Sequence, residues 1–183
     1  MTNKVIAIVG MAGSGKSTAS NYFASKGFSV VRFGEIVIEE IKRRGLLCNQ
    51  QNEQIVREEL RAKHGMSILA EMSLPFIRRK LEDNQSVVID NLVSFSEYKI
   101  LRREVNNELI VLALFTSRNL RYTRLQSREF RPLTLEEATN RDEMEIQKIE
   151  KGGPIAMADF IIINDDSKQH LFKKIDLFVA SLG

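Results

Sequence analysis

The fold of this chain is decided by residues 10–17, which read Gly10-Met11-Ala12-Gly13-Ser14-Gly15-Lys16-Ser17. They match the pattern G-x-x-x-x-G-K-[ST], in which glycines let the backbone curl until successive N–H groups point at phosphate oxygens. An apolar run at Lys4–Val9 precedes the pattern and predicts a buried strand, and we expect a helix to begin at Lys16 and to stop at Gly27. The sequence therefore predicts a phosphate-binding loop between a strand and a helix, whose dipole adds positive charge at the loop.

Short segments rich in valine and isoleucine predict the remaining strands. They are Ser29–Phe33, Ser86–Asp90, Leu109–Phe115 and Phe160–Ile163. Helical patterns separate these strands, and such an alternation implies a parallel sheet with right-handed crossovers and helices on both faces. The expected fold class is α/β, with three layers in the order α/β/α.

Two of the crossovers are several times longer than the roughly twelve residues that a helical connection needs. The first covers residues 35–83, and Pro75 is expected to kink or restart its last helix. Its helical patterns are Glu35–Arg44, Gln50–His64 and Ser67–Leu81. The second covers residues 116–159, is rich in arginine and ends at Gly152-Gly153-Pro154, a strong helix stop. Since no flexible linker is present, we expect one domain over residues 1–183 with two structured lobes.

The composition limits the possible classes of function. Hydrophobic residues make up 43% and charged residues 28% of the chain, as in folded globular proteins, and the formal net charge is +3. This surplus is too small for a protein that coats nucleic acid or an anionic membrane, so any recognition of anions must be local. A basic sequence interleaved with aromatic residues would indicate RNA binding, and the chain contains none. We therefore expect no nucleic-acid partner.

The cysteine content and the apolar runs indicate a cytoplasmic protein. Cys48 stands alone, so no disulfide can form within the chain, and no cysteine–histidine cluster has metal-ligand spacing. The longest apolar run, Leu109–Phe115, is far shorter than the roughly 18 residues of a membrane-spanning helix, and no signal-like stretch follows Met1. We therefore expect a reducing, cytosolic setting without a membrane partner. No pattern in the sequence indicates an oligomeric state.

Three residues are candidates for binding the phosphates and a metal. Lys16 is expected to reach the β- and γ-phosphates of a nucleotide, and the Ser17 hydroxyl is a hard oxygen ligand suited to Mg²⁺. Asp90 ends the third predicted strand, where a parallel sheet would present its carboxylate beside the loop. We expect Asp90 to hold Mg²⁺ through water, and the alternative is an aspartate that only caps a turn.

The arginines after the fourth strand have a helical spacing. Arg121, Arg124 and Arg128 stand at positions i, i+3 and i+7, which predicts that their guanidinium groups share one helix face. Like charges on one face repel each other unless an anion joins them, and a polyphosphate suits the fork of donors that arginine presents. The alternative is a solvated basic face that nearby glutamates balance.

With these motifs in place, nearly the whole chain resembles the P-loop nucleotide kinases. The resemblance is to adenylate-kinase-like nucleoside monophosphate kinases and dephospho-CoA kinases, especially to the small archaeal-type proteins related to both. It implies a five-stranded sheet in the order 2-3-1-4-5 and the use of ATP and Mg²⁺. It also implies that residues 35–83 bind the phosphoryl acceptor and that residues 116–159 contain a lid over ATP.

The resemblance assigns roles to individual residues. Its phosphate-loop contacts are Gly10, Ala12, Gly13, Ser14, Gly15, Lys16, Ser17 and Thr18. In the segment Arg124–Arg128, it implies that Arg124 packs on the adenine and that Arg128 reaches the phosphates. Arg141 resembles a lid arginine that returns to the transferring phosphoryl group, and Asn164 resembles a residue in the loop against the adenine.

Two positions depart from the family pattern on the acceptor side. The arginines that usually clamp the acceptor phosphate are absent, with Ile38 after the second strand and Val93 after the third. Other arginines of the first insertion could substitute for them. The candidates are Arg57, Arg61, Arg78 and Arg79.

The need for a general base depends on the acceptor. A phosphate acceptor is already ionised at pH 7, because its second pKa is about 6, and needs no base. A hydroxyl acceptor needs a carboxylate to take its proton, and the candidates are Glu35 first and Asp90 second. The alternative for Glu35 is a helix N-terminal residue that only favours the dipole.

We expect a phosphotransferase that moves the γ-phosphoryl group of ATP to a nucleotide-like small molecule of the nucleoside monophosphate or dephospho-CoA type. One alternative is an ATPase or nucleotide-dependent switch that acts on a protein partner. Another is a module that binds ATP with little turnover. Dependence of ADP formation on an acceptor would distinguish these hypotheses.

Overall fold

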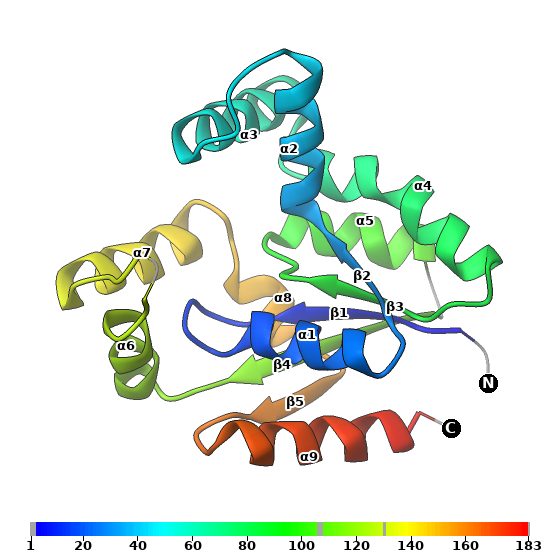
Figure 1. The fold of residues 1–183 in the computed structure, drawn as a ribbon, viewed down its shortest axis with the longest axis vertical. Coiled ribbons are helices and arrows are strands. Elements are labelled where there is room, and N and C mark those ends of the chain that lie inside the picture. The colour runs from blue at the N-terminus through cyan, green and yellow to red at the C-terminus, as the bar shows by residue number, and fades with distance from the viewer. Residues whose placement is uncertain (1–2, 106–107, 130, 183) are drawn as a thin grey trace.

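The computed structural model describes residues 3–105, 108–129 and 131–182. In this part of the chain, parallel strands form one sheet in the order β2-β3-β1-β4-β5 (Figure 1). The strands are β1 (Val5–Val9), β2 (Ser29–Arg32), β3 (Val87–Asp90), β4 (Leu109–Phe115) and β5 (Phe160–Ile163). The α/β class and the strand order 2-3-1-4-5 are confirmed.

Helices connect all of these strands and follow the last one. They are α1 (Lys16–Ser25), α2 (Phe33–Arg43), α3 (Gln50–His64), α4 (Ile68–Glu82), α5 (Phe95–Val105), α6 (Arg118–Gln126), α7 (Leu135–Gln147), α8 (Gly152–Ala156) and α9 (Lys168–Ala180). The first long crossover thus contains α2, α3 and α4, and α4 runs through Pro75 without restarting. The second contains α6, α7 and α8. A capping box of Thr134 and Glu137 fixes the start of α7.

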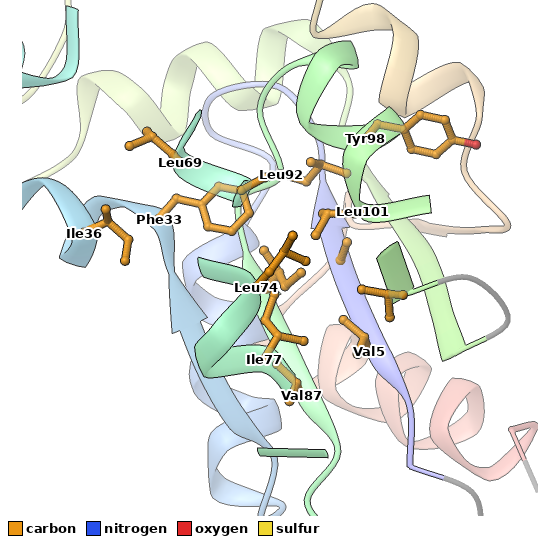
Figure 2. Packing of buried hydrophobic residues seen from close by; sticks show 14 of the residues in the cluster. Val5, Phe33, Ile36, Leu69, Leu74, Ile77, Val87, Leu92, Tyr98 and Leu101 are labelled. Carbon is orange, nitrogen blue, oxygen red and sulfur yellow. The ribbon is translucent and has the colours of Figure 1, made fainter. Parts of the chain in front are cut away.

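The core lies on both faces of the sheet, because side chains alternate along each strand. On one face, Val5, Ala7 and Val9 of β1 pack with α2, α4 and α5. Figure 2 shows this cluster, in which Leu74 and Ile77 of α4 lie between the strands and the helices. On the other face, the remaining residues of β1 pack with α1 and α9. Each large apolar side chain buried in this way contributes about 1.5–3 kcal/mol, so the sheet is a stable platform for its loops.

A smaller apolar cluster joins the loop after β1 to the second crossover. Ala12 of the loop packs with Tyr122 and Leu125 of α6 and with Ala138 of α7. These two helices therefore lie directly beside the phosphate-loop motif, as Figure 1 shows. Among the described residues, none of the helices combines the length and the apolar character that a membrane crossing requires.

Candidate functional site

The loop between β1 and α1 has a backbone that only glycine adopts readily. Gly13 and Gly15 have φ angles of +82° and +96°. A Cβ atom on Gly13 would stand 2.7 Å from the carbonyl oxygen of Arg121, and one on Gly15 would overlap the side-chain nitrogen of Asn164. The loop is therefore held from two sides by segments far along the chain, and glycine is required at both positions.

Lys16 follows this loop and folds back over it. Its Nζ atom donates hydrogen bonds to the carbonyl oxygens of Gly10, at 2.9 Å, and Met11, at 3.1 Å. Burial and, second, the positive charge of Lys151 lower the pKa of Lys16 to about 7, although the charge of Glu145 opposes both effects. The site therefore disfavours the charged form of Lys16 until an anion arrives.

Lys151, which the sequence analysis did not single out, lies beside Lys16. Its side chain is buried, with the residue only 2% exposed, and its Nζ atom is 2.8 Å from Oε2 of Glu145. The other carboxylate oxygen of Glu145 accepts a hydrogen bond from Nε of Arg141 at 3.2 Å. Burial would raise the pKa of Glu145, but Lys151 and Arg141 lower it more strongly, so Glu145 is ionised and holds both cations. The buried Glu145 thus holds Arg141 and Lys151, both from the second crossover, beside the loop.

Lys16, Arg141 and Lys151 line a cavity of about 680 Å³ at the carboxyl ends of the strands. Among the described residues, its charged lining consists of seven cations and one carboxylate, Asp90. The cations are Lys16, Arg32, Arg124, Arg128, Arg141, Lys151 and Lys168. Ser17 and Thr18 also line the cavity. Such an excess of one sign is costly unless an anion enters, and several of these cations are forked donors that suit phosphate oxygens.

Asp90 lies at the end of β3, opposite Arg32 in the register of the sheet. Its Oδ2 atom is 3.4 Å from Nε of Arg32, while its Oδ1 atom is buried and has no hydrogen-bond partner among the described residues. An unpartnered carboxylate oxygen and the Ser17 hydroxyl in one cavity fit a Mg²⁺ ion that also binds phosphates and water. The described residues contain no cluster of three or more carboxylate, histidine or cysteine groups, so phosphate oxygens and water would supply the remaining ligands of any such metal site.

The expectation that three arginines share one helix face towards an anion is wrong. Arg121 is buried, at 6% exposure, and its guanidinium pairs with both carboxylate oxygens of Asp142, at 3.0 Å and 2.6 Å. It also donates to the carbonyl oxygen of Ala12, so it ties the loop to α7. Arg128 lies beyond the end of α6, and only Arg124 and Arg128 of the three line the cavity. The countercharge of Asp142 explains the difference.

Asn164 and Arg124 line a small hollow beside the loop. The side-chain nitrogen of Asn164 donates to the carbonyl oxygen of Ser14 at 2.9 Å, so this buried amide fixes the loop. A hollow of about 180 Å³ lies between Arg124, Asn164 and Leu171. This is the place where the family resemblance leads us to expect an adenine.

The structure places Glu35 outside the cavity. It is exposed at the start of α2, its Oε1 atom is 3.4 Å from Nη1 of Arg32, and it lines a separate hollow with Phe76. Arg78 is also remote, since it pairs with Glu104 at 2.7 Å, and Arg79 is exposed on α4 and lines none of these cavities. Arg57 and Arg61 lie closer, in a cavity between α3 and the second crossover.

Comparison with known families and structures agrees with this geometry. A family model described as AAA domain (AAA_17) matches residues 9–150, which is more than half of the chain. The chain belongs to the AAA_17 family. This AAA_17 chain is 36% identical over 181 residues to a UPF0200 protein of Thermococcus gammatolerans, with 97% of this chain and 95% of the relative covered.

Solved structures with the same fold include kinases of small molecules. A shikimate kinase from Acinetobacter baumannii has a TM-score of 0.59 at 18% identity, covering 98% of the AAA_17 chain and 94% of the kinase. A dephospho-CoA kinase from Campylobacter jejuni has a TM-score of 0.57 at 16% identity, covering 100% and 99%. The P-loop kinase fold expected from the sequence is therefore confirmed.

Proposed function

We propose that this AAA_17 chain is a phosphotransferase that moves the γ-phosphoryl group of ATP to a nucleotide-like small molecule. The observation that carries the proposal is the cavity with seven cations, because the phosphate loop, the end of β2 and the second long crossover all contribute cations to it. Phosphoryl transfer needs positioning and charge neutralisation more than covalent chemistry, and this lining supplies both. The solved kinases with the same fold support a small-molecule acceptor.

The cations have distinct roles in the proposed reaction. Lys16 binds the β- and γ-phosphates, and it regains its full charge when it does so. Arg128, Arg141 and Lys151 neutralise the charge that spreads over the oxygens of the transferring group. Glu145 touches no phosphate, and it positions Arg141 and Lys151 through their ion pairs.

We propose that Ser17 and Asp90 hold Mg²⁺, directly or through water. When bound, the ion supplies further neutralisation of the phosphate charge. Arg124 and the segment at Asn164 bind the base of the nucleotide in the small hollow beside the loop. Residues 35–83 bind the acceptor and residues 116–159 close over ATP, within one domain over residues 1–183. Because the thiol of Cys48 is free and exposed, we place the reaction in the reducing cytoplasm.

A panel of acceptors tests this function. The purified protein is mixed with Mg·ATP alone and with AMP, CMP, UMP, dephospho-CoA or unphosphorylated nucleosides, and ADP and the phosphorylated product are measured. We expect ADP to form at a rate that depends on one acceptor class, and a Lys16→Met variant to lose this activity. An Arg79→Met variant is the matched control, since it removes an exposed arginine outside these cavities.

If ADP forms equally with and without every acceptor, the protein is an ATPase or a switch that acts on a protein partner, and not a kinase. Tight ATP binding without any ADP would indicate a nucleotide-binding module. Either result would overturn the proposed function.

A further inference from the structure

A second basic cavity adjoins the phosphate-loop cavity. It has a volume of about 630 Å³ and lies between α3 and the second crossover. Figure 1 shows these two segments beyond the carboxyl ends of the strands. Arg57 and Arg61 of α3 line one side, with Glu53 and Glu58, and Arg131 is among the residues on the other. The two cavities share Arg128 and Arg141, so a group held between these arginines faces both spaces.

Arg61 is held in this cavity by a buried carboxylate. Glu97, which is 0% exposed, accepts hydrogen bonds from the backbone N–H groups of Val93 and Ser94 at 2.9 Å and 3.0 Å. Its other oxygen is 3.5 Å from Nη2 of Arg61, whose side chain is only 15% exposed. Nε of Arg61 is buried and has no partner among the described residues. Glu97 therefore anchors Arg61 beside the loop after β3, and the Nε donor of Arg61 stays available for a ligand.

Unlike Arg61, the cavity residues Arg57 and Arg128 have no ion pair among the described residues. Burial lowers the pKa of Arg57, and the nearby charge of Arg61 lowers it further, although Glu53 and Glu58 oppose the effect. Burial also lowers the pKa of Arg128, as does the charge of Arg141. In the described lining of this cavity, five arginines, Arg57, Arg61, Arg128, Arg131 and Arg141, outnumber two carboxylates, Glu53 and Glu58. A bound dianion stabilises such an excess of guanidinium groups.

We propose that this cavity binds an acceptor that carries a phosphomonoester, and that an oxygen of this phosphate is the nucleophile. The inference rests on the proposed function and narrows its acceptor to one chemical class. Arg57 and Arg61 bind the acceptor phosphate from α3, and Arg128 and Arg141 bind it from the side of ATP. They stand in for the cations that are missing at Ile38 and Val93.

The balance of the transfer agrees with this geometry. An ionised oxygen of the acceptor phosphate bonds to the γ-phosphorus, and the bond from this phosphorus to the β,γ-bridging oxygen breaks. The electron pair leaves with the bridging oxygen as ADP, and the acceptor becomes a diphosphate. No proton has to be removed, because the second pKa of a phosphomonoester is about 6. The position of Glu35, outside both cavities, therefore does not impede the reaction.

Paired ligands test the acceptor class by binding alone. The affinities of AMP, CMP, UMP and ribose 5-phosphate are measured by calorimetry against those of adenosine, cytidine, uridine and ribose, with a non-hydrolysable ATP analogue already bound. We expect at least one phosphorylated ligand to bind about tenfold to a hundredfold more tightly than its twin, as charged hydrogen bonds imply. This advantage should be lost in Arg57→Met and retained in Arg79→Met.

Kinetics then test the nucleophile and the role of Glu97 as a positioning residue. We expect Arg57→Met and Glu97→Gln to raise the KM of the phosphorylated acceptor about tenfold or more, with the KM of ATP unchanged, because neither residue lines the phosphate-loop cavity. A variant that merely loosens the fold would change both constants.

The outcomes separate this inference from the proposed function. Transfer to hydroxyl acceptors but not to any phosphomonoester would overturn the inference, while the proposed phosphotransferase function would be supported. Absence of transfer to every acceptor would overturn the proposed function, and the binding measurements would still decide whether the cavity takes a phosphomonoester. Equal affinity for each ligand and its unphosphorylated twin would overturn the inference in either case.

Discussion

Nucleotide binding should be coupled to proton uptake by Lys16. In the free protein its pKa is lowered to about 7, first by burial and then by the charge of Lys151. At pH 8, an amine with this pKa is only about one-tenth protonated. Phosphates next to the amine favour its charged form, so binding should return Lys16 to almost full protonation. The expected uptake is about 0.9 proton at pH 8, about 0.5 at pH 7 and close to zero at pH 6.

The same shift predicts how the stability of the free protein depends on pH. When the pKa of a lysine is lower in the folded than in the unfolded protein, the lysine destabilises the folded state. This effect has its full size at pH values below the folded pKa. This destabilisation is relieved as the pH rises from about 7 towards 10.5, because the folded protein then releases its proton first. Lys16 therefore contributes a gain in stability above pH 7 in the absence of nucleotide, and bound nucleotide removes this gain.

Calorimetry measures the proton uptake directly. A non-hydrolysable ATP analogue and Mg²⁺ are titrated into the protein at pH 8 in buffers with different ionisation enthalpies. The slope of the observed enthalpy against the buffer enthalpy gives the number of protons taken up. The Lys16→Met variant keeps a similar apolar stem without the amine and should show a slope close to zero. A slope below about 0.2 in the unmodified protein, or the same slope in both proteins, would refute the reasoning.

Three further changes have expected outcomes. Asp142→Asn leaves the guanidinium of Arg121 buried without its countercharge, so urea denaturation should show a loss of about 3–5 kcal/mol in the free energy of unfolding. Asp90→Asn should raise the Mg²⁺ concentration needed for half-maximal ADP formation, and an unchanged magnesium titration would exclude Asp90 from the metal site. Gly13→Ala places a Cβ atom against the carbonyl oxygen of Arg121 at positive φ, so a fluorescent ATP analogue should bind far more weakly, and unchanged affinity would contradict the steric argument.

The sheet and the phosphate loop could be predicted from the sequence because their signals are local. Leu109–Phe115 and Phe160–Ile163 are short apolar runs, and they form β4 and β5 with the predicted bounds. The loop is a contiguous motif, so its strand and helix could be located directly. Lys16, Ser17 and Asp90 gather in one cavity as expected, because parallel strands end at the same edge of the sheet.

The remaining site residues depend on contacts between distant segments. Lys151 has no motif of its own, and its position depends on the buried carboxylate of Glu145 in the preceding helix. Helical spacing placed Arg121 on an anion-binding face, but spacing contains no information about Asp142, which neutralises it from α7. Arg32 was missed because its relation to the site arises only from the register of β2 and β3.

The contacts that hold the phosphate loop determine when the loop can adopt its shape during synthesis on the ribosome. The loop is near the start of the chain, yet its neighbours Arg121 and Asn164 are synthesised much later. β1 is also a central strand, whose partners β3 and β4 follow it by many residues. A nascent chain therefore carries the complete motif long before it can hold the loop in shape. Competence to bind nucleotide should arise only when the last strand has emerged, so truncated translation products should not sequester ATP.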